Sequence, residues 1–192
     1  MLLGELMMSN EIIKNIDTAI EKVWLEDLKT DYDNNFLLKE DSLKNAFYFH
    51  LRNRLGEDFL NNNNLRIFTE YFINGERIDL AIVEIDSVAV EDYHLSDCVI
   101  RVLAAVEMKY KGASVSDDVF YGDVNKIVSF INSWGNETKH YLAFIQEKYF
   151  KTGDIVNWLE DEQASKVRGK VTELYAYWDQ ESDETVWSVV NH

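Results

Sequence analysis

The feature that most constrains the fold is the dipeptide Asn74-Gly75, which separates two stretches rich in β-branched and aromatic residues. Asn-Gly is the sequence best suited to a two-residue type I′ turn, so residues 65–73 and 76–83 are predicted to pair as a β-hairpin. Counting outward from such a turn places Glu70 directly opposite Asp79. The hairpin is therefore expected to bring two carboxylates face to face.

A third strand is predicted over residues 98–110. Its first part is almost entirely apolar, which is typical of a strand covered on both faces. The apolar run gives way to Glu107-Met108-Lys109 at the carboxyl end. The alternation of a strand puts Glu107 and Lys109 on one face of the sheet and Met108 on the other. We therefore expect a carboxylate and an ammonium group side by side at the end of a central strand.

Further helices and strands are predicted around this unit. Apolar residues recur at helical spacing in three segments, and a more polar helix and several strands follow. We expect Asp31–Asn35 to end the first helix and Gly56, in a left-handed conformation, to cap the second. The predicted helices cover residues 11–29, 38–55, 116–134 and 154–166, and the additional strands cover residues 140–146, 172–178 and 184–190.

The whole chain, residues 1–192, is predicted to form a single domain. It contains no proline, no internal repeat and no linker-like segment that would mark a boundary. The order of elements indicates an α/β or α+β fold around a central mixed sheet flanked by helices, because a helical crossover of that length returns to a parallel strand. Residues 1–35 would add an N-terminal helix, and residues 148–192 a helix and a C-terminal β-hairpin.

Glu40 lies near the start of the second predicted helix, on its inward face. It precedes Leu43, Phe47 and Leu51 by three, seven and eleven positions and so shares their stripe, whereas Asp41 falls toward solvent. The position also has a purely structural explanation, because a carboxylate in the first turn interacts favourably with the helix dipole.

Asp79 and Glu107 together supply the carboxylate oxygens that Mg²⁺ or Mn²⁺ prefers as ligands. Such a cation stabilises charge on a phosphoryl group and lowers the pKa of a water, while Lys109 beside it could hold the attacking hydroxide. With Glu70 as a further ligand, the cation would also relieve the repulsion between Glu70 and Asp79. Alternatively, one of these two acids is exposed at the hairpin edge, Lys109 and Arg77 neutralise the cluster, or Lys109 simply extends to water.

These residues resemble the PD-(D/E)XK superfamily of restriction-endonuclease-like nucleases, whose shared core is an αβββαβ unit. The resemblance covers about residues 38–147 and implies that Asp79 and Glu107 are metal ligands and that Lys109 is the catalytic lysine. It further implies Glu40 as an auxiliary ligand and the Met108 carbonyl as another. Ile78 departs from the pattern, which has proline at this position. The matching segments are Glu40, Arg77-Ile78-Asp79-Leu80 and Val106-Glu107-Met108-Lys109.

The resemblance also implies a DNA substrate, cleaved with Mg²⁺ or Mn²⁺ in bacterial defence or in a mobile element. The net charge of -16 opposes this partner, because phosphate binding relies on lysine and arginine. The alternatives are an inactive module of the same fold whose acidic surface binds a protein partner, and a subunit that gains a basic surface from another chain or as a homodimer. The residues predicted to contact phosphates are Lys111, Lys126, Lys166, Arg168 and Lys170.

Composition also bears on the compartment. The single cysteine, Cys98, excludes an internal disulfide and a cysteine-based zinc cluster, so we expect a cytoplasmic protein. No apolar run approaches the roughly 18–20 residues of a membrane span, and no membrane partner is expected. Residues 1–8 lack the basic start of a signal peptide, and Met7 or Met8 is an alternative start.

Overall fold

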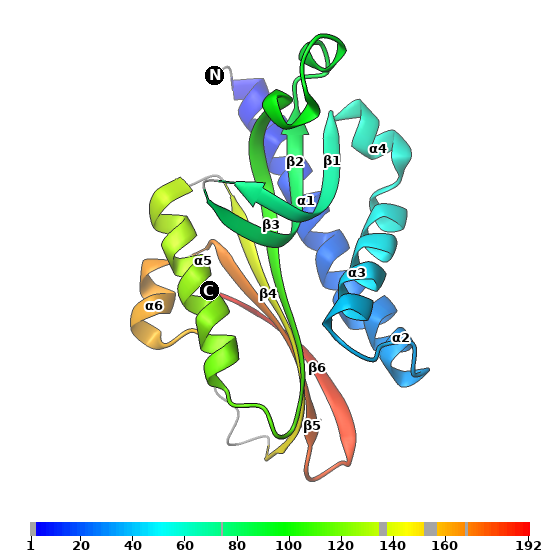
Figure 1. Cartoon of the computed structure of the whole chain (residues 1–192), viewed down its shortest axis with the longest axis vertical. Helices are drawn as coiled ribbons and strands as arrows, with labels where there is room; N and C mark the ends of the chain where they lie inside the picture. Colours follow the sequence, from blue (N-terminus) through cyan, green and yellow to red (C-terminus); the bar gives the residue numbers. More distant parts are fainter. Residues whose placement is uncertain (1–2, 74, 135–137, 152–156, 168) are drawn as a thin grey trace.

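The protein folds around one six-stranded mixed sheet, whose strands lie in sequence order from β1 to β6 (Figure 1). This computed structural model describes residues 3–73, 75–134, 138–151, 157–167 and 169–192. Strands β1 to β3 pair antiparallel, β3 to β5 parallel, and β5 with β6 antiparallel, so the predicted mixed sheet and C-terminal hairpin are confirmed. The strands are β1 Leu65–Ile73, β2 Glu76–Ile85, β3 Val99–Gly112, β4 Lys139–Phe150, β5 Val171–Asp179 and β6 Glu184–Asn191.

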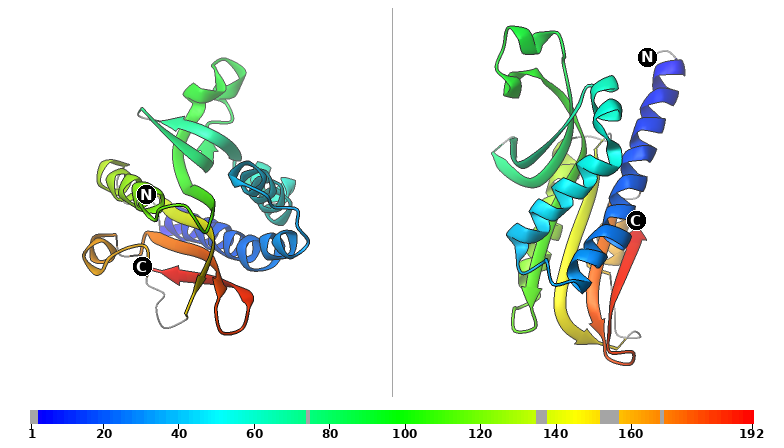
Figure 2. Two further views of the ribbon diagram at one scale, coloured as in Figure 1. Left: turned by 60° about the horizontal axis from the view of Figure 1, so that its bottom comes forward. Right: turned by 90° about the vertical axis from the view of Figure 1, so that its right-hand side faces the viewer.

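Helices lie on both faces of the sheet (Figure 2). One face carries the N-terminal helices and α3, and the other carries α5 and α6. Two short 3-10 turns, Ala89–Glu91 and Leu95–Cys98, occupy the excursion between β2 and β3 at the top of Figure 1. The helices are α1 Leu3–Lys22, η1 Val23–Leu28, α2 Lys29–Asp33, α3 Glu40–Leu55, α4 Glu57–Asn62, α5 Asp118–Trp134 and α6 Asp161–Lys166.

The central strand β3 is covered on both faces, as its apolar sequence predicts. Met108 and Tyr110 pack into the core under α1 and α3, together with Trp24 and Phe47. Glu107 and Lys109 consequently point to the face that α5 covers. The predicted alternation at the end of this strand is confirmed, and it sets the position of the candidate site.

A second core lies between the sheet and α5. Phe120 of α5 is fully buried and stacks on Trp158 with ring centroids 4.6 Å apart, and Phe144 of β4 packs edge-on against both rings. Large buried aromatic rings of this kind contribute strongly to packing. This core holds α5, and the polar side chains that α5 carries, against the sheet.

The first helix is longer than predicted. Residues 3–33 form a continuous helical segment that contains the π-helical stretch η1, and it ends at Asn34 and Asn35. The Asn34 side-chain amide donates to the Thr30 carbonyl at 2.8 Å, and Asn35 has a left-handed φ of 61°. The predicted break over Asp31–Asn35 is confirmed at Asn34 and Asn35, whereas the backbone of Asp31 itself remains helical. The Asp31 carboxylate contacts His50 of α3 at 2.8 Å.

The backbone conformation of Gly56 differs from the left-handed cap predicted at the end of the second helix. The positive φ of 77° is confirmed, but a ψ of 152° lies outside the left-handed helical region. The chain leads directly into the short helix α4, which the sequence pattern did not indicate, and Gly56 precedes its first residue. A glycine is still favoured here because few other residues adopt this φ.

The region before β5 also differs from the predicted helix over residues 154–166. Residues 154–156 lie outside the described part of the chain, and the helix that follows is only α6. The backbone amides of Trp158 and Leu159 donate to the buried Glu173 carboxylate at 2.9 and 2.8 Å. The helical prediction is wrong over residues 157–160 because these tertiary hydrogen bonds replace helical ones. None of the helices in the described ranges combines the length and apolar character that crossing a bilayer requires.

Candidate acidic site between β2, β3, α3 and α5

Asp79 lies at the point where β2 and β3 separate. The two strands pair from Leu80 and Val106 onward, so the Met108 amide has no partner on β2. The Asp79 side chain takes that place, and its Oδ2 accepts a hydrogen bond from Met108 N at 2.8 Å. Asp79 is only 8% exposed. The hydrogen bond fixes this carboxylate beside the strand that carries Glu107 and Lys109.

Glu107 is the most buried acid of the site, with 3% of its surface exposed. Burial and the negative charge of Asp79 raise the pKa of Glu107 to about 8, although the Lys126 ammonium acts in the opposite direction. Lys126 Nζ lies 2.7 Å from Glu107 Oε1 and also donates to the Arg77 carbonyl. A positive charge bound beside Glu107 would therefore stabilise the ionised form of this carboxyl group.

Lys109 lies between two acids from different helices. Its Nζ is 3.1 Å from Oδ2 of Asp123 on α5 and 3.5 Å from Oε2 of Glu40 at the start of α3. Burial lowers the pKa of Lys109, but the charges of Asp123 and Glu40 more than offset this, so the net shift is upward. The site therefore includes Glu40, as the helical stripe predicted, and holds Lys109 as an ammonium.

Glu70 and Asp79 lie opposite each other as predicted, but a lysine contacts both carboxylates. The register of Thr69 with Leu80 and of Tyr71 with Ile78 does place the two acids opposite each other, but Glu70 has a φ of 53° that interrupts the ladder. Lys44 of α3 contacts both, at 2.9 Å from Asp79 Oδ1.

Arg77 also pairs with Glu70, at 2.8 Å between Nε and Oε2. The repulsion that suggested a cation is thus balanced by Lys44 and Arg77. Of the alternatives, neutralisation by Arg77 is confirmed for Glu70, whereas Lys109 pairs with other acids.

The predicted phosphate-contacting residues separate into two groups. Lys126 joins the site through Glu107, and Lys111 joins it through Glu40 Oε2 at 3.5 Å. Lys166 instead pairs with Glu162 on α6 at 2.7 Å, and Lys170 immediately precedes β5, two strands away from β3. Arg168, the remaining member, lies outside the described residues.

Two residues of the site were missed from the sequence. Lys44 follows Glu40 by four positions, so both share a face of α3. Asp123 lies three positions after Phe120 and four before Ile127, within the apolar stripe of α5. A polar residue inside an apolar stripe was the signal that would have found Asp123. Burial raises the pKa of Asp123, while Lys109 opposes the shift.

The arrangement offers oxygen ligands but does not group them around one point. Within the described ranges, no three acidic, histidine or cysteine side chains are placed so as to hold a metal ion. Lysines lie between the acids. Three buried carboxylate oxygens, Glu40 Oε2, Glu107 Oε1 and Asp123 Oδ2, each lie within 3.5 Å of a lysine ammonium. Buried acceptors of this kind suit a hard divalent cation.

Chemically, the site combines acids that favour a cation with ammonium groups that favour an anion. Glu40, Asp79, Glu107 and Asp123 could bind a divalent cation, and Lys109 and Lys126 could face a phosphate drawn to it. Comparisons of this chain with profiles of protein families, with curated proteins and with solved structures find no match.

Proposed function

We propose that this protein is a metal-dependent nuclease that hydrolyses phosphodiester bonds of DNA. The observation that supports it most is the pairing of Asp79 with the Met108 amide, which sets one carboxylate beside Glu107 and Lys109. Apart from the short helix α4 after α3, the order of α3, β1, β2, β3, α5 and β4 also agrees with the αβββαβ core of the restriction-endonuclease-like proteins. On this proposal the D…ExK residues form the active site.

Asp79 and Glu107 would hold the cation, with Glu40 completing the ligand set. Bound there, Mg²⁺ or Mn²⁺ would polarise a phosphoryl oxygen and lower the pKa of a water. On binding the cation, Asp79 would release the ammonium group of Lys44 on α3, and Glu107 would release that of Lys126 on α5. Because Glu107 has a raised pKa, it would lose a proton on binding a cation, and cation affinity would increase with pH.

Lys109 would act on the phosphate and on the attacking water. Its ammonium is held near Asp123 and Glu40 and is an N–H donor that can orient a hydroxide or offset charge on the transition state. The ammonium group of Lys126, which donates a hydrogen bond to the Arg77 carbonyl, would contact the same phosphate. In this account Asp123 is a positioning residue, because it acts through Lys109.

The local charge of the site answers the objection raised by the net charge of -16. Basic side chains gather around the carboxylates although the chain as a whole is acidic, and they would be available to phosphates once a cation takes their place. The excess of acidic residues over the whole chain would limit the affinity for DNA, and the phosphate contacts of the basic side chains would make cleavage dependent on salt. The basic residues concerned are Lys44, Arg77, Lys109, Lys111 and Lys126.

Cleavage of plasmid and of single-stranded DNA tests the proposal. We expect the wild-type protein to cut one of them with Mg²⁺ or Mn²⁺ and to stop when EDTA is added. Asp79→Asn and Lys109→Met should each reduce the rate by about a hundredfold or more, whereas the matched control Glu91→Gln, in an exposed turn, should not. If the wild type and both variants cut at the same rate, the nuclease assignment is wrong.

A second candidate is a catalytically inactive module that binds a protein partner. The observation that favours it is the balance of charge within the site, where Lys44, Lys109 and Lys126 already pair with the acids. Such a cluster has no need of a cation. Absence of DNA cleavage by wild type across salt and metal conditions, together with absence of Mn²⁺ binding, would support this candidate.

A further inference from the structure

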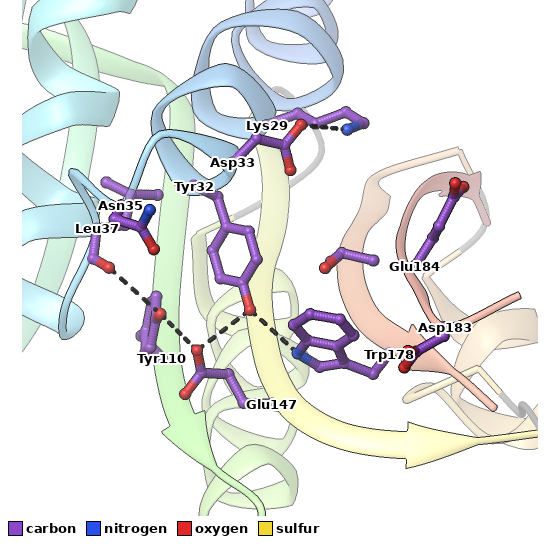
Figure 3. A pocket seen from close by; sticks show the side chains of 11 residues that line it. Lys29, Tyr32, Asp33, Asn35, Leu37, Tyr110, Glu147, Trp178, Asp183 and Glu184 are labelled. Carbon is purple, nitrogen blue, oxygen red and sulfur yellow. Dashed lines mark hydrogen bonds and ion pairs between the residues drawn. The ribbon is translucent and has the colours of Figure 1, made fainter.

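A cavity of about 550 Å³ lies on the opposite face of β3 from the acidic site (Figure 3). It is bounded by α2 and the loop after it, by the carboxyl ends of β3, β4 and β5, and by the turn between β5 and β6. Its volume falls within the roughly 300–1,000 Å³ of small-molecule pockets. Ligands commonly bind beyond the carboxyl ends of parallel strands, as this position does.

Glu147 forms the floor of the cavity and is held by two tyrosines. Its Oε1 accepts hydrogen bonds from the Tyr110 hydroxyl at 2.9 Å and from the Tyr32 hydroxyl at 3.1 Å. Burial and the nearby Glu147 carboxylate raise the pKa of both tyrosines, so both stay protonated donors. Trp178 Nε1 donates to the Tyr32 hydroxyl at 3.1 Å and extends the chain. The carboxylate is therefore fixed in place by neutral groups.

In the part of the chain that the structure describes, no lysine, arginine or histidine forms an ion pair with the Glu147 carboxylate. Lys29 lines the cavity, but it pairs with Asp33 one helical turn away. Asp183 and Glu184 add two further acids at the opposite wall. The cavity thus holds four carboxylates against one lysine that is already paired.

Aromatic rings form much of the remaining wall. Tyr32 and Tyr110 lie with ring centroids 6.3 Å apart, and Trp178 lies on the other side of Glu147 in Figure 3. Such faces attract organic cations through the ring quadrupole. The size of the cavity and its rings together favour a ligand with an apolar part.

We propose that this cavity binds an organic cation carrying an ammonium or guanidinium group, with the charge beside Glu147 and the hydrocarbon part against Tyr32 and Trp178. The ligand is either a free amine or a lysine or arginine side chain of a partner. This site is independent of the proposed nuclease activity, because Tyr110 and Lys109 point to opposite faces of β3.

Calorimetric titration of the full chain tests the proposal with three probes at matched ionic strength: spermidine, choline and a lysine-containing peptide. We expect at least one of them to bind in the wild type, while the neutral probe glycerol does not. Binding of a free amine identifies a small-molecule site, and binding of the peptide alone identifies a side-chain site. If none of the three cations binds at millimolar concentration, the proposal is overturned.

Glu147→Gln removes the charge and keeps an oxygen that both tyrosines can reach. We expect it to weaken cation binding by about tenfold or more, the effect of losing about 1.4 kcal/mol. Asp183→Asn, which suits the positive φ of that residue, should weaken binding less and covers the case in which Glu147→Gln does not fold. The exposed control Glu162→Gln on α6 should bind as the wild type does. Equal affinities in all four proteins would overturn the assignment of the charge to this cavity.

Discussion

The Asp79 carboxylate accepts a hydrogen bond from the Met108 backbone amide at 2.8 Å, at the point where β2 leaves β3. A side chain thus replaces the backbone partner that the strand would otherwise offer. The bond ties the acid of one strand to the strand that carries Glu107 and Lys109. The geometry of the candidate site is therefore part of how the sheet is held together.

Removing the Asp79 side chain should therefore destabilise the fold. Asp79→Ala leaves the Met108 amide without its acceptor and the Lys44 ammonium with Glu70 alone, and we expect a loss of about 1–3 kcal/mol in the free energy of unfolding. Asp79→Asn keeps an acceptor oxygen and should lose less. Urea unfolding of both variants with EDTA present measures the difference. Equal stability of Asp79→Ala and wild type would contradict the role of this hydrogen bond.

The raised pKa of Glu107 predicts a pH dependence of stability. The unfolded chain loses this proton near pH 4.5 and the folded chain only near pH 8, so the folded state binds more protons between these values. The contribution of Glu107 is therefore fully present below pH 4.5 and is lost as pH rises toward 8. Glu107→Gln should remove this slope.

The comparison is made by urea unfolding of wild type and Glu107→Gln in EDTA at both ends of that range. Relative to wild type, the variant should gain stability on going from the acidic to the alkaline end, by an amount on the order of a few kcal/mol. An unchanged difference between the two proteins across the range would show that burial does not raise the pKa of Glu107.

Lys44 should be the residue that allows Glu70 and Asp79 to lie opposite each other. Lys44→Met leaves two carboxylates without a shared cation, and the loss should be smaller when Glu70 is also changed to glutamine. A double-mutant cycle in urea measures this coupling, expected to be about 1 kcal/mol or more. Additive effects of Lys44→Met and Glu70→Gln would show that the contact contributes nothing.

Asp123 should control the charge of Lys109. Burial alone would lower the pKa of Lys109, and the charges of Asp123 and Glu40 raise it instead. We expect Asp123→Asn to lower the pKa of Lys109, because the larger of the two opposing charges is then lost. Titration of the labelled lysine side chains by NMR observes this directly. If the pKa of Lys109 stays the same in Asp123→Asn, Asp123 does not control the charge of Lys109.

The packing of α5 should be as important as its polar side chains. Phe120 is fully buried against Trp158 and Phe144, so Phe120→Ala should cost about 3–5 kcal/mol of stability. Val119→Ala on the exposed side of the same helix is the matched control and should change stability by about 0.5 kcal/mol or less. Similar losses in the two variants would contradict the position of α5 on the sheet.

Local patterns were enough to predict the sheet and part of the site. The Asn74-Gly75 pair set the register of β1 with β2, and strand alternation separated Glu107 and Lys109 from Met108. These predictions rest on neighbours in sequence. Asn74 itself lies outside the described residues, so the type of the turn stays a prediction.

The rest depended on contacts between distant segments. Lys44 reaches Glu70 and Asp79 only because α3 packs beside the first hairpin, and Asp123 reaches Lys109 only because α5 covers β3. The helical prediction failed near Trp158 for the same reason, since the competing acceptor is Glu173 on β5. A pattern within one segment can mark Asp123 as a polar residue on an inward face, but it does not identify the partner of that residue on another segment.

Titration of the wild type with Mn²⁺ by calorimetry tests the central claim most directly, with Asp79→Asn as the matched variant. If Asp79 and Glu107 hold a divalent cation, the wild type should bind Mn²⁺, release protons on binding and bind more tightly as pH rises toward 8, because Glu107 must be ionised. Asp79→Asn should bind about tenfold or more weakly. No binding heat in the wild type, or equal affinity in the variant, would contradict the claim.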